Sequence, residues 1–257
     1  HLKNAQPVLF AHYLLAYVEM FKRDYQKFQN TINNLNQNPL GSGALAGTSY
    51  NIDRHFTSKA LGFKEPTSNS IDSVADRDYA IEFLFASSLC AMHLSRLAEE
   101  IIIWNSDLVN LINIEDSMLT GSSMMPQKKN PDSAELIRGK TGKIYGNLNS
   151  LLITMKGLPL SYFKDMQEDK AGVFDTFDTL SINLKLACQL IKGIKPNKDN
   201  MYKAAQAGYT TATDFADYLV KKGMSFREAY KKSAQVVNIA EKQKKRLDEL
   251  DFKTVEQ

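Results

Sequence analysis

The sequence predicts an all-α fold, built as a bundle of long helices with a smaller helical domain at its C-terminal end. Over several long stretches the apolar residues recur every three or four positions, which is the spacing of a buried helix face. Prolines and glycines mark the breaks between these stretches. We find no convincing strand pattern, no internal repeat and no low-complexity tract, so the helical interpretation covers the whole chain.

Length and composition indicate a globular protein of one or two domains. The chain has 257 residues, of which 43% are hydrophobic. Its formal net charge of +3 is too small to predict binding to nucleic acid or to a membrane surface. No apolar run approaches the roughly 18 residues that span a bilayer. Cys90 and Cys188 are interpreted as small buried hydrophobic residues rather than as a disulfide, and we expect a cytoplasmic protein.

The first half of the chain contains two long predicted helices. One begins after Pro7 and ends in the asparagine-rich stretch before Pro39. The glycine-rich residues 39–48 follow it, either as a plain linker or, as we favour, as an ordered functional segment. Residues 72–113 predict a second helix of about 40 residues, or about 60 Å, which is apolar on more than one face and is therefore buried in a bundle. Arg77, at its polar start, is interpreted as one of several paired, solvated charges, with a functional role as the alternative.

The second half predicts two further long helices and then a change of architecture. One helix covers residues 131–155, and the apolar residues of the next run from 173 to 194. The polar, proline-containing residues 195–200 predict a domain boundary. We therefore expect a central bundle domain at residues 1–195 and a C-terminal helical domain at residues 196–257. Three shorter helices are expected in the latter, at 201–207, at 212–222 after a capping Thr211, and at 225–246 after a capping Ser225.

The candidate chemistry is concentrated in residues 115–131, a loop that leads into a helix. Gly121 and two serines precede Lys128, and Asn130 followed by Pro131 is typical of a helix start. Backbone donors and lysine charges ahead of a helix N-terminus are suited to binding an anion. From composition alone, a solvated surface loop would explain the same residues.

Four stretches, in order along the chain, carry a recognisable pattern. They are His1-Leu-x-x-Ala-Gln-Pro7, Pro39 to Gly47, the string Gly-Ser-Ser-x-Met-Pro-x-Lys-x-Asn-Pro at residues 121–131, and Tyr162 to Lys170. The string at 121–131 resembles the signature of the fumarase/aspartase superfamily, and its Gln-Lys-Lys-Asn-Pro-Asp-Ser version, like the other three stretches, resembles the argininosuccinate lyase family. Chance does not explain four ordered matches.

The resemblance implies reversible cleavage of argininosuccinate into arginine and fumarate, a step of arginine biosynthesis that needs no cofactor. Removing a proton beside a carboxylate places a second negative charge on that group, so fixed positive charge must face it. We assign this task to Lys128. Ser122 matches the family's catalytic position and would take the proton, although no base that could activate its hydroxyl is visible in the sequence.

The resemblance also assigns residues to proton delivery and to substrate binding. His1 matches the family's catalytic histidine and Glu135 the carboxylate that orients it, a pair suited to protonating the leaving nitrogen. Which of Ser122 and His1 is the base and which the acid stays open. The expected substrate-binding residues, whose amides and ammonium group complement the substrate carboxylates, are Asn130, Tyr162, Gln167 and Lys170.

The residues also bear on two other functions and on a metal site. A non-catalytic, crystallin-like structural protein would fit the family, but the presence of Ser122, Lys128 and Glu135 together argues against it. Adenylosuccinate lyase is a sister enzyme, and the sequences at 127–129 and 167–170 argue against that substrate. No metal site is predicted, because the remaining histidines lack acidic or cysteine partners at ligand spacing; these are His12, His55 and His93.

The resemblance further implies a homotetramer whose active sites each take segments from three chains. Helices too apolar for one small domain to cover favour a shared central bundle. Because His1, Ser122 and residues 162–170 lie at the ends of rigid helices, one subunit cannot readily bring them together. Set against a full family member, the resemblance implies that residues 1–257 are a fragment without the N-terminal domain and the C-terminal end, and we expect them alone to show little or no activity.

Overall fold

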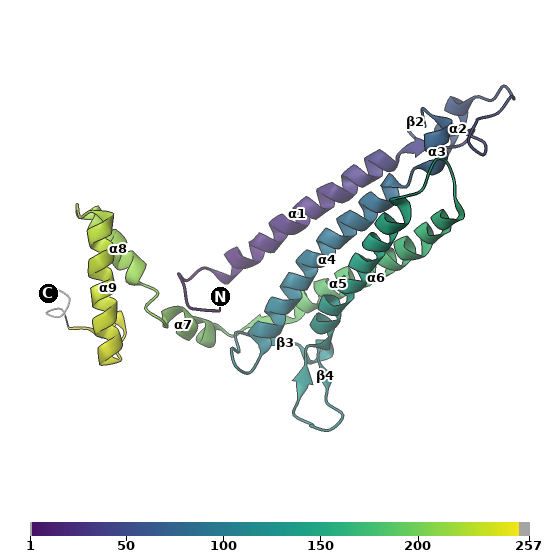
Figure 1. The fold of residues 1–257 in the computed structure, drawn as a ribbon. Helices are drawn as coiled ribbons and strands as arrows, with labels where there is room; N and C mark the ends of the chain where they lie inside the picture. The colour runs from purple at the N-terminus through teal and green to yellow at the C-terminus, as the bar shows by residue number, and fades with distance from the viewer. Residues whose placement is uncertain (1, 252–257) are drawn as a thin grey trace. The chain divides into compact units, whose positions relative to one another are not determined.

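The computed structural model describes residues 2–251, and helices dominate it (Figure 1). The predicted all-α fold is confirmed. The described residues form two compact units. The larger unit comprises Leu14–Val109 and Ile114–Lys195, while the smaller one groups the residues up to Tyr13 and Asn110–Asn113 with those from Pro196 onward.

Four long helices build the larger unit. They are α1 (Phe10–Leu35), α4 (Asp78–Asn105), α5 (Asp132–Met155) and α6 (Asp169–Gly193). Helix α4 packs against both α5 and α6, which also pack against each other, and Figure 1 shows the three as a bundle. The bundle core contains fully buried side chains from all three helices, among them Leu84, Ile101, Ile137, Ile144 and Leu190. Many other buried α4 residues are alanine or serine, which allow the helices to approach closely.

Helix α1 lies along α4 through polar contacts between side chains. Three hydrogen-bonded pairs join the two helices, with residue numbers that rise on α1 and fall on α4, so the helices are antiparallel. The pairs are Tyr17–Glu100, Asp24–His93 and Asn34–Glu82. His93 Nδ1 and Asp24 Oδ2 are 2.7 Å apart and buried. His93 is therefore a structural residue as predicted, but it has an acidic partner that the sequence spacing did not reveal.

The long helix predicted at residues 72–113 is shorter in the structure than expected. The chain forms α3 (Ser70–Ala75) and then the 28-residue α4, which is about 42 Å long. Between them Asp76 has an extended backbone, and its Oδ1 accepts a hydrogen bond from the Asp78 N–H at 2.7 Å. Ser106, with a ψ of 148°, ends α4. Short polar side chains that bond to nearby backbone compete with helix continuation.

The prediction that the chain has no strands also needs correction. Short strands occur in the described residues, each two or three residues long, and so short a segment cannot show the alternation that identifies a strand. They are β1 (Gln37–Asn38), β2 (Glu65–Pro66), β3 (Ile112–Ile114), β4 (Thr120–Gly121), β5 (Lys129–Asn130) and β6 (Ile194–Pro196). The helical turns η1 (Asp116–Met118), η2 (Lys164–Glu168) and η3 (Leu247–Glu249) were likewise not predicted.

The glycine-rich residues 39–48 form an ordered turn rather than a plain linker. Gly41 and Gly43 have φ angles of +93° and +61°, which favour glycine. Arg54, at the start of α2 (Arg54–Leu61), donates hydrogen bonds to the carbonyl oxygens of Leu40 at 2.9 Å and Thr67 at 2.8 Å. One guanidinium group thus fixes this turn against the segment after β2.

The smaller unit contains α7 (Lys198–Gln206), α8 (Ala212–Lys221) and α9 (Phe226–Gln243). The predicted cap at Ser225 is confirmed, because its Oγ accepts the Glu228 N–H at 3.3 Å. Thr211 precedes α8 without a side-chain cap bond, so that predicted cap is wrong. The cysteine interpretation holds for Cys90, which is buried, and fails for Cys188, which is exposed on α6.

Candidate active site

The signature loop is a hairpin at the N-terminal end of α5. Strands β4 and β5 pair antiparallel, with Gly121 opposite Lys129. The Ser122 N–H donates to the Lys128 carbonyl oxygen at 3.1 Å and closes the loop. The expected helix start is shifted by one residue, because Asn130 lies in β5 and Pro131 is the residue before the first helical turn. Asn130 is therefore a strand residue and does not cap the helix.

Ser122 is held in this loop by its own hydroxyl oxygen. Its Oγ accepts the backbone N–H groups of Met124 at 3.2 Å and Met125 at 3.1 Å. Two amide donors aimed at one oxygen stabilise negative charge on it, which favours ionisation of the hydroxyl. Among residues 2–251, no carboxylate, imidazole or amine forms a hydrogen bond to this oxygen, so a base would have to come from elsewhere.

The two lysines of the loop have different surroundings. Lys129 Nζ lies 2.6 Å from Asp116 Oδ2, in an exposed ion pair. Lys128 is exposed, and within the described part of the chain no hydrogen bond or ion pair engages its ammonium group. Lys128 is thus the lysine whose charge is available to an anion. Glu135 is exposed in the first turn of α5, while His1, its predicted partner, lies outside the described residues.

The predicted binding residues Tyr162, Gln167 and Lys170 lie together at the start of α6. Gln167 Nε2 donates to the Tyr162 hydroxyl oxygen. Met166, between them in η2, is almost fully buried and anchors this segment to the bundle. Lys170 is about half exposed, and its Nζ donates to Asp169 Oδ1 at 3.0 Å.

Arg77 joins this second group of residues, although the sequence favoured a paired, solvated charge over a functional role. Its Nε donates to Asp169 Oδ2 at 2.6 Å, and both side chains are nearly buried. That interpretation was wrong because the partner lies 92 positions away in the sequence. Burial also raises the pKa of the neighbouring Asp76 carboxyl, more than the hydrogen bond from the Asp78 N–H lowers it.

The two groups of predicted residues lie at opposite ends of the bundle. The hairpin precedes α5, and residues 162–170 follow its C-terminal end. Helix α5 has 24 residues, so it separates them by about 36 Å. Figure 1 shows the β4 hairpin at one end of the bundle and the start of α6 at the other. One chain therefore brings Ser122 and Lys128 together, and Tyr162 and Lys170 together, but does not join the two pairs.

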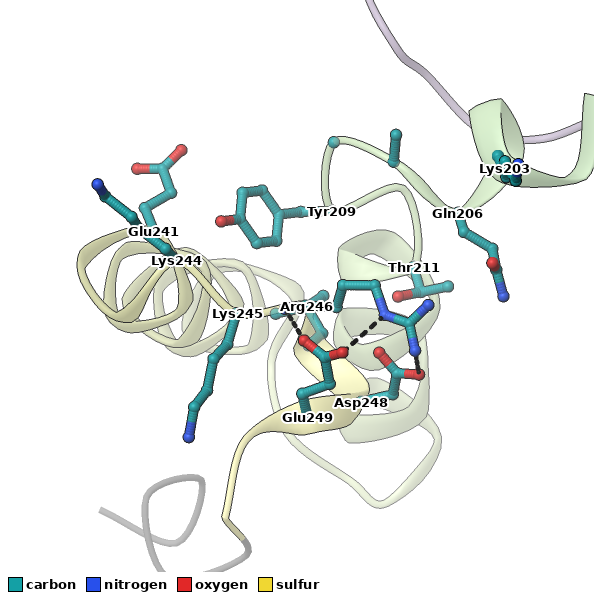
Figure 2. Close-up of a pocket in the computed structure, with 13 residues that line it drawn as sticks. Lys203, Gln206, Tyr209, Thr211, Glu241, Lys244, Lys245, Arg246, Asp248 and Glu249 are labelled. Atoms are coloured by element: carbon teal, nitrogen blue, oxygen red, sulfur yellow. Dashed lines mark hydrogen bonds and ion pairs between the residues drawn. The ribbon is translucent and has the colours of Figure 1, made fainter. Parts of the chain in front are cut away.

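The smaller unit has a hollow of about 750 Å³ with charged walls (Figure 2). Arg246 reaches Asp248 at 2.9 Å and Glu249 at 3.5 Å there, and lysines from α7 and from the end of α9 also line it. None of the predicted site residues lines this hollow. In residues 2–251 no cluster of three or more metal-ligating side chains occurs, and no helix is long and apolar enough to cross a membrane.

Known proteins match this chain over nearly its whole length. The sequence model of a family described as lyase matches residues 1–146, and that of the argininosuccinate lyase C-terminal region matches residues 209–257. Argininosuccinate lyase from Pelagibacter ubique is 58% identical over 98% of this chain and 55% of its own length. The enzyme of that name from Ehrlichia canis is 56% identical over 99% of this chain and 54% of its own length. The chain thus spans about half the length of the curated relatives it matches.

Solved structures agree with the fold. A crystal structure of EDDS lyase in complex with formate has a TM-score of 0.90 and 31% identity, and the match covers 99% of this chain and 51% of that one. A class II fumarase from Schistosoma mansoni has a TM-score of 0.83 at 19% identity, covering 96% of this chain and 55% of that one, which supports the fold alone.

Proposed function

The chain belongs to the argininosuccinate lyase family of the fumarase/aspartase superfamily, and from this premise we propose that the protein cleaves argininosuccinate reversibly into arginine and fumarate. The observation that carries the proposal is the identity of 53–58% to bacterial argininosuccinate lyases over nearly the whole chain. Such a reaction would place the protein in arginine biosynthesis. Its substrate and products are small charged metabolites, which agrees with a cytoplasmic location.

In this proposal the hairpin performs the proton abstraction. Ser122 removes the proton from the carbon beside the substrate carboxylate, and the two amide donors on its Oγ support the alkoxide that this requires. The positive charge of Lys128 faces the carboxylate on which the second negative charge develops. The carbon–nitrogen bond then breaks, and the guanidino nitrogen receives a proton.

Proton delivery to the leaving nitrogen is assigned to His1, with Glu135 as its orienting carboxylate. This assignment rests on the family resemblance. Asn130 lies on the strand that closes the hairpin, and Tyr162, Gln167 and Lys170 bind the substrate from the other group. An ammonium group and amide groups are the donors that several substrate carboxylates require.

We also propose a homotetramer in which each active site combines segments from different chains. The 36 Å that α5 places between the two groups, about its full length, motivates the sharing. Large apolar side chains are exposed along α5 and α6, among them Ile153 at 62%, Phe174 at 64% and Phe177 at 59%. Exposed apolar surface of this kind is typical of a subunit interface.

The test is a fumarate-release assay on the full-length protein that carries residues 1–257. With argininosuccinate we expect fumarate absorbance to rise, and with adenylosuccinate we expect none. Release from adenylosuccinate alone would assign the sister activity. No release from either substrate, from a folded protein of the expected oligomeric mass, would favour a crystallin-like structural role.

A further inference from the structure

The Asp169 carboxylate lies between two cations at the start of α6. Its Oδ2 accepts the Arg77 Nε–H at 2.6 Å, and its Oδ1 accepts a hydrogen bond from Lys170 Nζ at 3.0 Å. The Asp169 side chain is only 9% exposed and that of Arg77 13%, whereas that of Lys170 is 56% exposed. The arrangement thus runs from a buried guanidinium to an ammonium group that solvent can reach.

Arg77 is itself fixed by the break between α3 and α4. Its Nη1 donates to the carbonyl oxygens of Asp76 at 2.6 Å and Val74 at 3.2 Å. These carbonyls are accessible to it because the helix is interrupted at Asp76. The break at Asp76, between α3 and α4, therefore orients Arg77 toward α6.

The charges of the three side chains explain why a second cation is needed. Asp169 with Lys170 alone would be a neutral pair, and the carboxylate would compete with any anionic ligand for the ammonium group. With Arg77 on its other oxygen, the group of three carries one net positive charge, located at its exposed end. Asp169 can then orient Lys170 without neutralising it.

The surroundings strengthen these interactions. A cavity of about 590 Å³ adjoins the three side chains, and its remaining walls are mostly apolar. They include Phe28 and Ile32 from α1, Phe83 from α4 and Phe174 from α6. Charges interact more strongly beside such low-dielectric walls than in water, and an unpaired Arg77 or Asp169 here would be costly.

We propose that Arg77 is a positioning residue for substrate binding. Through Asp169 it holds Lys170 at the start of α6 and leaves the Lys170 charge available to a carboxylate of the substrate. The inference rests on the proposed function, in which Lys170 binds that substrate, and it assigns to Arg77 a role that requires no contact with the substrate.

The first experiment replaces Arg77 in the full-length protein. For Arg77→Gln we expect KM for argininosuccinate to rise about tenfold, with kcat within about threefold, because ground-state and transition-state binding are lost together. Arg77→Lys retains the charge without the fork geometry and should give an intermediate KM. The matched control is Lys143→Gln, which breaks an exposed ion pair between Lys143 on α5 and Asp175 on α6 and should leave KM within about twofold. An unchanged KM in both Arg77 variants would overturn the proposal.

A double variant separates the charge effect from a loss of structure. In Arg77→Gln the Asp169 carboxylate has Lys170 as its remaining cationic partner and neutralises it. Adding Asp169→Asn removes this competing charge and should reverse at least about a third of the increase in log KM. Removing both members of a buried pair is also less destabilising than removing one. A double variant with KM equal to or above that of Arg77→Gln would contradict the proposal.

A third measurement does not depend on turnover. We expect acylation of Lys170 by an amine-reactive ester, quantified by mass spectrometry against Lys164, to be about threefold slower in Arg77→Gln, because Asp169 then holds the ammonium group more tightly. Equal rates in both proteins would show that Arg77 does not control Lys170. If the wild-type protein released no fumarate, the proposed function would fail, and the labelling rates would still decide the role of Arg77.

Discussion

The hairpin before α5 and the start of α6 hold their charged side chains in different ways. At the hairpin, Lys128 and Glu135 are exposed, and the ion pair of Lys129 with Asp116 is open to solvent. At the start of α6, Lys170 forms an ion pair with Asp169, and Asp169 forms a second ion pair with the nearly buried Arg77. One end of the bundle thus presents exposed charges around an oriented hydroxyl, and the other presents a charge that a carboxylate orients.

This difference agrees with the tasks proposed for the two ends. Chemistry at Ser122 needs an alkoxide stabilised by donors, and the loop supplies two amide N–H groups while its lysine remains available. Binding needs a charge already in place, which lowers the entropy lost when the substrate is held. In the proposed function each end is incomplete by itself, since about 36 Å of helix separates the Ser122 hydroxyl from the Lys170 charge.

The largest expected effect concerns the stability of the two ion pairs. Asp169→Asn leaves the nearly buried Arg77 without its counter-charge and should lower the free energy of unfolding by about 3 kcal/mol. Asp116→Asn removes the exposed partner of Lys129 and should cost less than about 1 kcal/mol. Urea unfolding of both variants at one protein concentration measures the difference. Equal losses would show that the two ends do not differ in the way described.

The next effect concerns turnover at the hairpin end. Ser122→Ala should lower kcat at least about a hundredfold and leave substrate affinity nearly intact, because the lost hydroxyl acts in the transition state. The control is Ser123→Ala, which removes the adjacent exposed hydroxyl and should leave kcat within a few-fold. Turnover by Ser122→Ala within a few-fold of the wild type would exclude Ser122 as the proton-transfer residue.

A smaller effect, on affinity, is expected at the α6 end. Lys170→Met removes the fixed charge and should raise KM for argininosuccinate about tenfold, the loss of roughly one charge-assisted hydrogen bond. Steady-state kinetics separates this from an effect on the chemical step. A variant with unchanged KM and collapsed kcat would move Lys170 from binding to catalysis.

The sequence predicted what local patterns determine. Apolar spacing identified α1, α5 and α6, and the string at 121–131 located the hairpin that carries Ser122. The two-residue strands that close this hairpin were not predicted, because they are too short to show the alternation of apolar and polar residues that identifies a strand.

Contacts between distant residues were beyond the reach of such patterns. The partner of Arg77 lies 92 positions away and that of His93 lies 69 positions away. Each was therefore judged by its immediate neighbours, which gave a solvated charge for Arg77 and a histidine without an acidic partner for His93. The break at Asp76 was missed in part for the same reason, because Arg77 turns there toward Asp169 on α6. The other stabilising contact is local, since the Asp78 N–H donates to the Asp76 carboxylate.

The proposal that Ser122 and Lys170 of one active site come from different chains is tested most directly by mixing two impaired variants. Full-length Ser122→Ala and Lys170→Met proteins are dissociated together, reassembled at equal concentrations and assayed for fumarate release at a substrate concentration well below the wild-type KM, where the rate of each variant alone is about a tenth of the wild-type rate or less. If the residues come from different chains, about a quarter of the sites in random hybrids receive both wild-type residues, and activity should return toward that fraction of the wild-type value. If both residues came from one chain, every site would carry one lesion, and the mixture would show only the average of the two variants.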